Sequence, residues 1–71
     1  MENLRKLREA SHLTQLAVSV KTGIDQSLLS KYERGMRPPT VENLMILAEL
    51  YYTSLDYLMG LTDTATPYPR K

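Results

Sequence analysis

Apolar residues recur three and four positions apart along most of the chain, and over no useful length do they alternate singly with polar residues. The first spacing is that of helices with one apolar face, whereas alternation would indicate strands. Residues that start and end helices border the apolar segments, and the connections between segments are short. The sequence therefore predicts an all-α fold, a compact five-helix domain.

The second and third helices are bounded by residues that cap helix ends. Thr14 can cap the start of the second helix, and Gly23 can end it in a left-handed conformation. Asp25 can cap the third helix, which is expected over residues 25–34, and Gly35 can end it. Because so few residues separate the two helices, they are expected to be joined by a tight turn.

The remaining helices are predicted from the same kinds of signal. The first is expected over about residues 2–11. Thr40 follows two prolines, which exclude helix before it, and can cap a fourth helix. Ser54 can cap a short fifth helix that ends at Gly60. The fourth helix is expected to supply much of the core through Val41, Leu44, Leu47, Ala48 and Tyr51.

The third helix carries two chemically different faces. Its apolar stripe is made of Ile24, Leu29 and Tyr32. The remaining positions hold hydrogen-bonding and cationic side chains, namely Gln26, Ser27, Ser30, Lys31 and Arg34. Such a face suits the reading of an anionic polymer better than catalysis.

Composition narrows the function further. The chain has 71 residues, no cysteine and one histidine, His12, so it lacks disulfides and a recognisable set of metal ligands. No nucleophile–base pair or phosphate loop is present, and we expect neither an enzyme nor a bound cofactor or metal. No signal segment or membrane-spanning run is visible, so a cytoplasmic location without membrane contact is expected.

The charges are unevenly distributed, although the formal net charge is only +1. Through Arg37 there are seven Lys or Arg against four Asp or Glu, a surplus of three positive charges. The rest of the chain has two basic residues against four acidic ones, a surplus of two negative charges. A basic first half favours contact with phosphates, whereas the simpler alternative is a scatter of solvated surface charge.

Five segments, correctly spaced, resemble the Cro/phage-repressor-type helix-turn-helix family of bacterial and phage transcriptional regulators. They are "LTQ" at 13–15, "GI" at 23–24, "QSLLSKYERG" at 26–35, "RPPTVENL" at 37–44 and "SLDYLMG" at 54–60. The resemblance covers roughly residues 4–60 and implies a lambda-repressor-like fold. We therefore expect a helix-turn-helix DNA-binding domain over residues 1–60 and a flexible C-terminal tail over residues 61–71.

The resemblance also implies roles for individual residues. It implies base contacts for Gln26, Ser27 and Lys31, and DNA phosphate contacts for Gln15, Arg34 and Arg37. In the family the residue at Gln15 often braces the one at Gln26 as well. The resemblance further implies a structural ion pair between Arg8 and Glu33.

Some positions depart from the family pattern. Ser19 replaces a usual alanine, and its hydroxyl is expected to bond a carbonyl one turn back in the helix. Thr22 replaces a usual leucine, which predicts looser packing at that corner. His12 and Tyr52 stand where glycine commonly ends a helix, so both are expected to have positive φ.

These observations predict a sequence-specific regulator of double-stranded DNA, acting as a repressor, with the helix over residues 25–34 in the major groove of a palindromic operator. A single helix reads too few bases to find one site in a genome, so two copies are expected. Ile46 and Leu50 lie one turn apart on a face that the core is not expected to need, and with Tyr57 they form the predicted homodimer patch. The alternative is an antitoxin or another partner-binding module that uses this patch on the fourth and fifth helices to hold a different protein.

Overall fold

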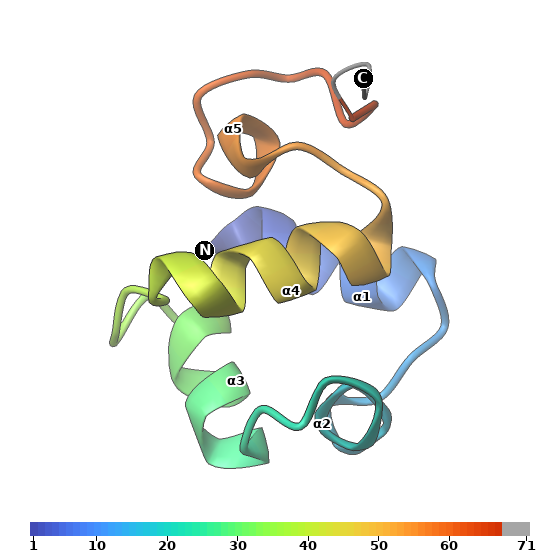
Figure 1. The fold of residues 1–71 in the computed structure, drawn as a ribbon, viewed down its shortest axis with the longest axis vertical. Coiled ribbons are helices and arrows are strands. Elements are labelled where there is room, and N and C mark those ends of the chain that lie inside the picture. Colours follow the sequence, from blue (N-terminus) through green and yellow to red (C-terminus); the bar gives the residue numbers. More distant parts are fainter. Residues whose placement is uncertain (68–71) are drawn as a thin grey trace.

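The computed structural model describes residues 1–67, and five helices account for most of them. They are α1 (Glu2–Ala10), α2 (Gln15–Thr22), α3 (Gln26–Glu33), α4 (Val41–Tyr51) and α5 (Leu55–Leu58). No strand occurs between residues 1 and 67, so the all-α fold with five helices is confirmed. In Figure 1, α4 lies across the centre with α1 behind it, α5 on one side, and α2 and α3 on the other.

The predicted caps start four of the helices. The side chains of Thr14, Asp25, Thr40 and Ser54 each accept a hydrogen bond from a backbone N–H in the first turn of α2, α3, α4 and α5, respectively. Each bond satisfies a donor that has no partner within its helix.

Left-handed residues end helices where the sequence predicts them. Gly23 closes α2 with φ of 77°, a conformation that costs glycine little because it lacks a Cβ atom. Tyr52 closes α4 with φ of 51°, and His12 has φ of 56° just after α1. The backbone of these two residues has positive φ, which is uncommon outside glycine and was expected from their positions.

The core lies where all five helices meet. Its buried apolar side chains are Leu4, Val18, Ile24, Leu29, Tyr32, Leu44, Leu47, Ala48 and Leu58. The hydroxyl of Tyr32, which is also buried, accepts a 2.9 Å hydrogen bond from Nδ2 of Asn43, so its polar atom has a partner. The predicted stripe of α3 is therefore entirely in the core.

Two sequence-based predictions about side chains are wrong. Val41, the first residue of α4, is 70% exposed and not part of the core. The hydroxyl of Ser19 donates forward to the carbonyl of Ile24 at 2.6 Å, since the turn after α2 brings that carbonyl within reach. It is Thr22 that bonds one turn back, donating to the carbonyl of Val18 at 2.7 Å.

The segment after α5 returns along the molecule without forming a helix. The N–H of Leu61 donates to the carbonyl of Asp56 at 2.8 Å, and the buried hydroxyl of Thr53 donates to the carbonyl of Ala65 at 2.6 Å. Residues 68–71 of the predicted tail lie outside the described residues. The flexibility of the tail stays a prediction.

Candidate nucleic-acid interface

The turn between α2 and α3 sets the direction of α3. It contains three residues, Gly23, Ile24 and Asp25, between the end of one helix and the start of the next. Figure 1 views α2 nearly along its axis while α3 lies across the view, so the two helices cross at a steep angle. Buried Ile24 anchors the turn in the core, and the Ser19 hydroxyl holds its carbonyl. These contacts fix α3 against α2 with one face outward.

The outward face of α3 presents the three side chains that the sequence assigns to base contacts. Gln26, Ser27 and Lys31 are all exposed, whereas Leu29 and Tyr32 on the opposite face are buried. An amide, a hydroxyl and an ammonium group are thus carried by a helix whose other face is fixed by the core. Together they offer both donors and acceptors to a ligand.

The first turn of α3 is organised by Asp25. Oδ2 of this carboxylate accepts from the backbone N–H of Ser27 at 3.1 Å and also from the Ser27 hydroxyl. The hydroxyl bond is the main reason that the pKa of Asp25 lies below its usual value. The carboxylate is therefore ionised at neutral pH and acts only as an acceptor.

Two arginines lie at the far end of α3 and just beyond it. Arg34 is exposed, and its Nε donates to the carbonyl of Ser30 at 3.3 Å, which holds the side chain along the helix. Arg37 is exposed in the connection to α4. Both positions suit contact with an anionic backbone, and their assignment to DNA phosphates stays a prediction.

A bidentate ion pair ties α1 to the end of α3. Arg8 Nε donates to Glu33 Oε2 at 2.8 Å, and Arg8 Nη2 donates to Glu33 Oε1 at 3.0 Å. The side chains are only 17% and 7% exposed, respectively. The hydrogen bond to Glu33 raises the pKa of Arg8, so the guanidinium remains charged. Two parallel charge-assisted bonds make this a strong polar link between α1 and the end of α3.

Two further hydrogen bonds extend the ion pair to α2, and neither was predicted. Arg8 Nη1 donates to the carbonyl of Leu13 at 3.0 Å, in the connection before α2. Gln15 Nε2 donates to Glu33 Oε1 at 3.2 Å, so the structure gives Gln15 a different partner from the expected Gln26. Only the packing of α1, α2 and α3 together brings these groups within reach, and spacing along the sequence carries no sign of it.

Tyr51 of α4 lies in the electrostatic field of this network. Burial and, to a smaller extent, the charge of Glu33 raise the pKa of Tyr51 to about 12, while Arg8 opposes the rise. The phenol is thus neutral at physiological pH. The network therefore contains one negative and one positive charge, which balance one another.

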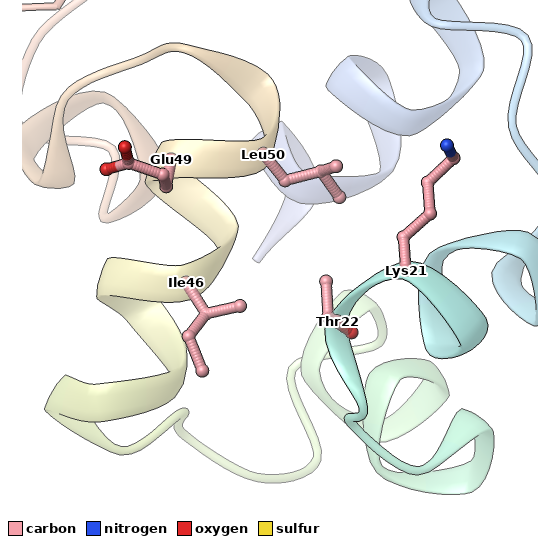
Figure 2. Close-up of a pocket in the computed structure, with 5 residues that line it drawn as sticks. All are labelled: Lys21, Thr22, Ile46, Glu49 and Leu50. Atoms are coloured by element: carbon pink, nitrogen blue, oxygen red, sulfur yellow. The ribbon is translucent and has the colours of Figure 1, made fainter.

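The predicted dimer or partner patch is partly buried. Ile46 and Leu50 pack against the core, so the expectation that the core does not need them is wrong. Both extend from α4 toward the end of α2, where they line a surface pocket of about 290 Å³ with Lys21 and Thr22 (Figure 2). Tyr57 is also partly exposed, but it belongs to α5, which lies on the side of α4 opposite α2 (Figure 1), and it does not line this pocket.

Residues 1–67 contain no group of three or more His, Cys, Asp or Glu side chains that could hold a metal ion. Among these residues, no helix combines the length and the apolar character needed to cross a membrane.

Two packed helices joined by a three-residue turn, the second with an outward polar face, define a helix-turn-helix protein. The sequence model of the helix-turn-helix family matches residues 4–58, and the chain belongs to this family. The family expected from the sequence is thereby confirmed.

Several curated proteins are similar to the chain over most of its length. It is 42% identical over 66 residues to the uncharacterized HTH-type transcriptional regulator YobD of Bacillus subtilis, covering 93% of this chain and 59% of YobD. It is 41% identical to the uncharacterized HTH-type transcriptional regulator y4dJ of Sinorhizobium fredii, covering 93% of this chain and 84% of y4dJ. It is 37% identical to the cryptic phage CTXphi transcriptional repressor RstR of Vibrio cholerae, covering 83% of this chain and 53% of RstR.

The chain thus spans little more than half the length of YobD and RstR. All three relatives are named as transcriptional regulators or repressors, in agreement with the expectation that the chain is not an enzyme. No solved structure matches the chain significantly.

Proposed function

We propose that the protein is a sequence-specific regulator of transcription that binds double-stranded DNA through α3 and represses its target. The observation that carries this proposal is the exposed set of Gln26, Ser27 and Lys31 on a helix whose opposite face is buried. The major groove is wide enough to admit a helix, and each of these side chains can bond a base edge there. The name of the repressor RstR supports the same direction of control.

Affinity for DNA is expected to depend on phosphate contacts and therefore on salt. The chain should bind a random-sequence duplex more tightly than a single strand of equal length. It should also lose affinity steeply between about 50 and 200 mM salt, because binding releases cations from the duplex and this release is less favourable at high salt. Fluorescence anisotropy with labelled oligonucleotides measures both quantities. Equal binding to duplex and single strand, or no dependence on salt, would contradict the proposal.

The proposal includes a homodimer on a palindromic operator. One helix contacts only a few bases, and each good contact discriminates by about 1–3 kcal/mol, which is too little to select one site in a genome. Two copies with their α3 helices about 34 Å apart, one turn of DNA, would read two half-sites. The pocket lined by Ile46 and Leu50 is the proposed contact between copies.

The Leu50→Lys variant should be a folded monomer at concentrations where the native chain is a dimer. The lysine stem can replace the leucine in the partly buried site while its ammonium group reaches water, and the two like charges would repel across a twofold axis. Val20→Lys is the matched control, because Val20 is 79% exposed and lies outside the patch. Sedimentation velocity and circular dichroism of both variants test this expectation.

A native chain that remains monomeric at high micromolar concentration, or a Leu50→Lys variant that still dimerises, would contradict the proposed contact. The first result would favour the partner-binding alternative, in which the same patch holds a different protein.

A further inference from the structure

The hydroxyl of Ser27 has only one hydrogen, and the structure shows where it is used. The group is exposed in the first turn of α3 and donates to Oδ2 of Asp25. An ionised carboxylate has no hydrogen to offer, so the hydroxyl must be the donor in this pair. Its oxygen is left with lone pairs and no free hydrogen, and it can only accept from a further partner.

Several features maintain this arrangement. The backbone N–H of Ser27 donates to the same carboxylate oxygen at 3.1 Å, which holds the carboxylate over the helix start. The positive end of the helix also favours a negative charge there. The low pKa of Asp25 keeps the group ionised over the physiological range. Ser27 is thus oriented before any ligand arrives.

We infer that Ser27 is a specificity-determining residue that acts only as an acceptor and, on the DNA strand that it contacts, selects a base with an amino group in the major groove, adenine or cytosine. The inference rests on the proposed function. Adenine N6 and cytosine N4 are donors, whereas guanine O6 and N7 and thymine O4 are acceptors. Phosphate oxygens are acceptors as well, so the same orientation assigns Ser27 to a base and not to the DNA backbone.

The test compares the native chain with Ser27→Ala on the preferred duplex and on duplexes with each base pair changed in turn. Ser27→Ala should relax the choice at one base pair in each half-site and should weaken binding about two- to tenfold per half-site. At that position 2-aminopurine in place of adenine, or 2-pyrimidinone in place of cytosine, removes the amino group from the major groove. This replacement should weaken the native chain by the same factor and leave Ser27→Ala unaffected.

Asp25 variants test the orientation of the hydroxyl separately. Asp25→Ala frees the hydroxyl to donate, so discrimination between the amino base and guanine or thymine at that position should narrow. Asp25→Asn is the matched control, because its amide oxygen can accept from Ser27 and cap the helix, and it should retain the preference.

The inference is overturned if Ser27→Ala leaves every base preference intact, or if removal of the amino group at the relaxed base pair weakens the native chain and Ser27→Ala equally or weakens neither. In either case Gln26→Ala and Lys31→Ala would still relax the base preference at the DNA positions that these two residues contact, and the proposed function would stand. A native chain with no base preference at any position would overturn the proposed function and the inference with it.

Discussion

Glu33→Ala should lower the free energy of unfolding by about 3 kcal/mol, because it leaves the partly buried guanidinium of Arg8 without its carboxylate. The pair is 17% and 7% exposed, so solvent screens it little. A domain of this size is stabilised by only about 4–10 kcal/mol in total, and the melting temperature should therefore fall by more than about 10 °C. Urea and thermal unfolding followed by circular dichroism measure both values.

Glu9→Ala is the matched control for this prediction. Glu9 pairs with Arg5 at 3.7 Å on the surface of α1, and both side chains are more than half exposed. Surface pairs of this kind contribute at most about 1 kcal/mol. The account would be contradicted if Glu33→Ala and Glu9→Ala had equal effects. It would also be contradicted if the Arg8→Ala, Glu33→Ala double variant were as unstable as the sum of the single ones.

The second large effect separates residues that read bases from residues that hold phosphates. Gln26→Ala and Lys31→Ala should each weaken the binding free energy for the preferred site by about 1–3 kcal/mol. Each should also relax the base preference at one position per half-site. An amide can pair with adenine N6 and N7, and an ammonium group can reach guanine O6 and N7. Arg37→Ala should weaken binding to all sequences alike and lower the salt dependence by about one unit of log–log slope per lost contact.

Binding of these variants to matched and singly substituted duplexes at several salt concentrations tests the assignment. If Arg37→Ala changed the base preference while Gln26→Ala and Lys31→Ala did not, the connection after α3 would read the sequence. The roles proposed for the helix and the connection would then be reversed.

The helix boundaries could be predicted from the sequence because capping is local chemistry. The side chains of Thr14 and Thr40 each accept from an N–H three residues further along the chain. Gly23 adopts the left-handed conformation that ends α2, which costs glycine little. The spacing of Leu29 and Tyr32 likewise places them on one face of α3 and in the core. None of these conclusions depends on where the other helices lie.

Contacts between elements could not be predicted in the same way. Ser19 bonds the Ile24 carbonyl only because the turn folds back over α2, and Gln15 meets Glu33 only because three helices pack together. Val41 follows the apolar spacing of α4 but is 70% exposed, because no other helix covers it. The Asp25–Ser27 hydroxyl bond is an intermediate case, since the two residues are close in sequence but only the cap geometry brings the hydroxyl against the carboxylate.

Selection from a pool of random duplexes by the purified chain tests whether the protein recognises a DNA sequence through α3. We expect enrichment of a palindrome whose half-sites lie one turn of DNA apart, and loss of conserved bases at defined positions when Gln26→Ala or Lys31→Ala is selected in parallel. A pool that remains random after selection with the native chain, or a consensus that is unchanged in both variants, would contradict this expectation.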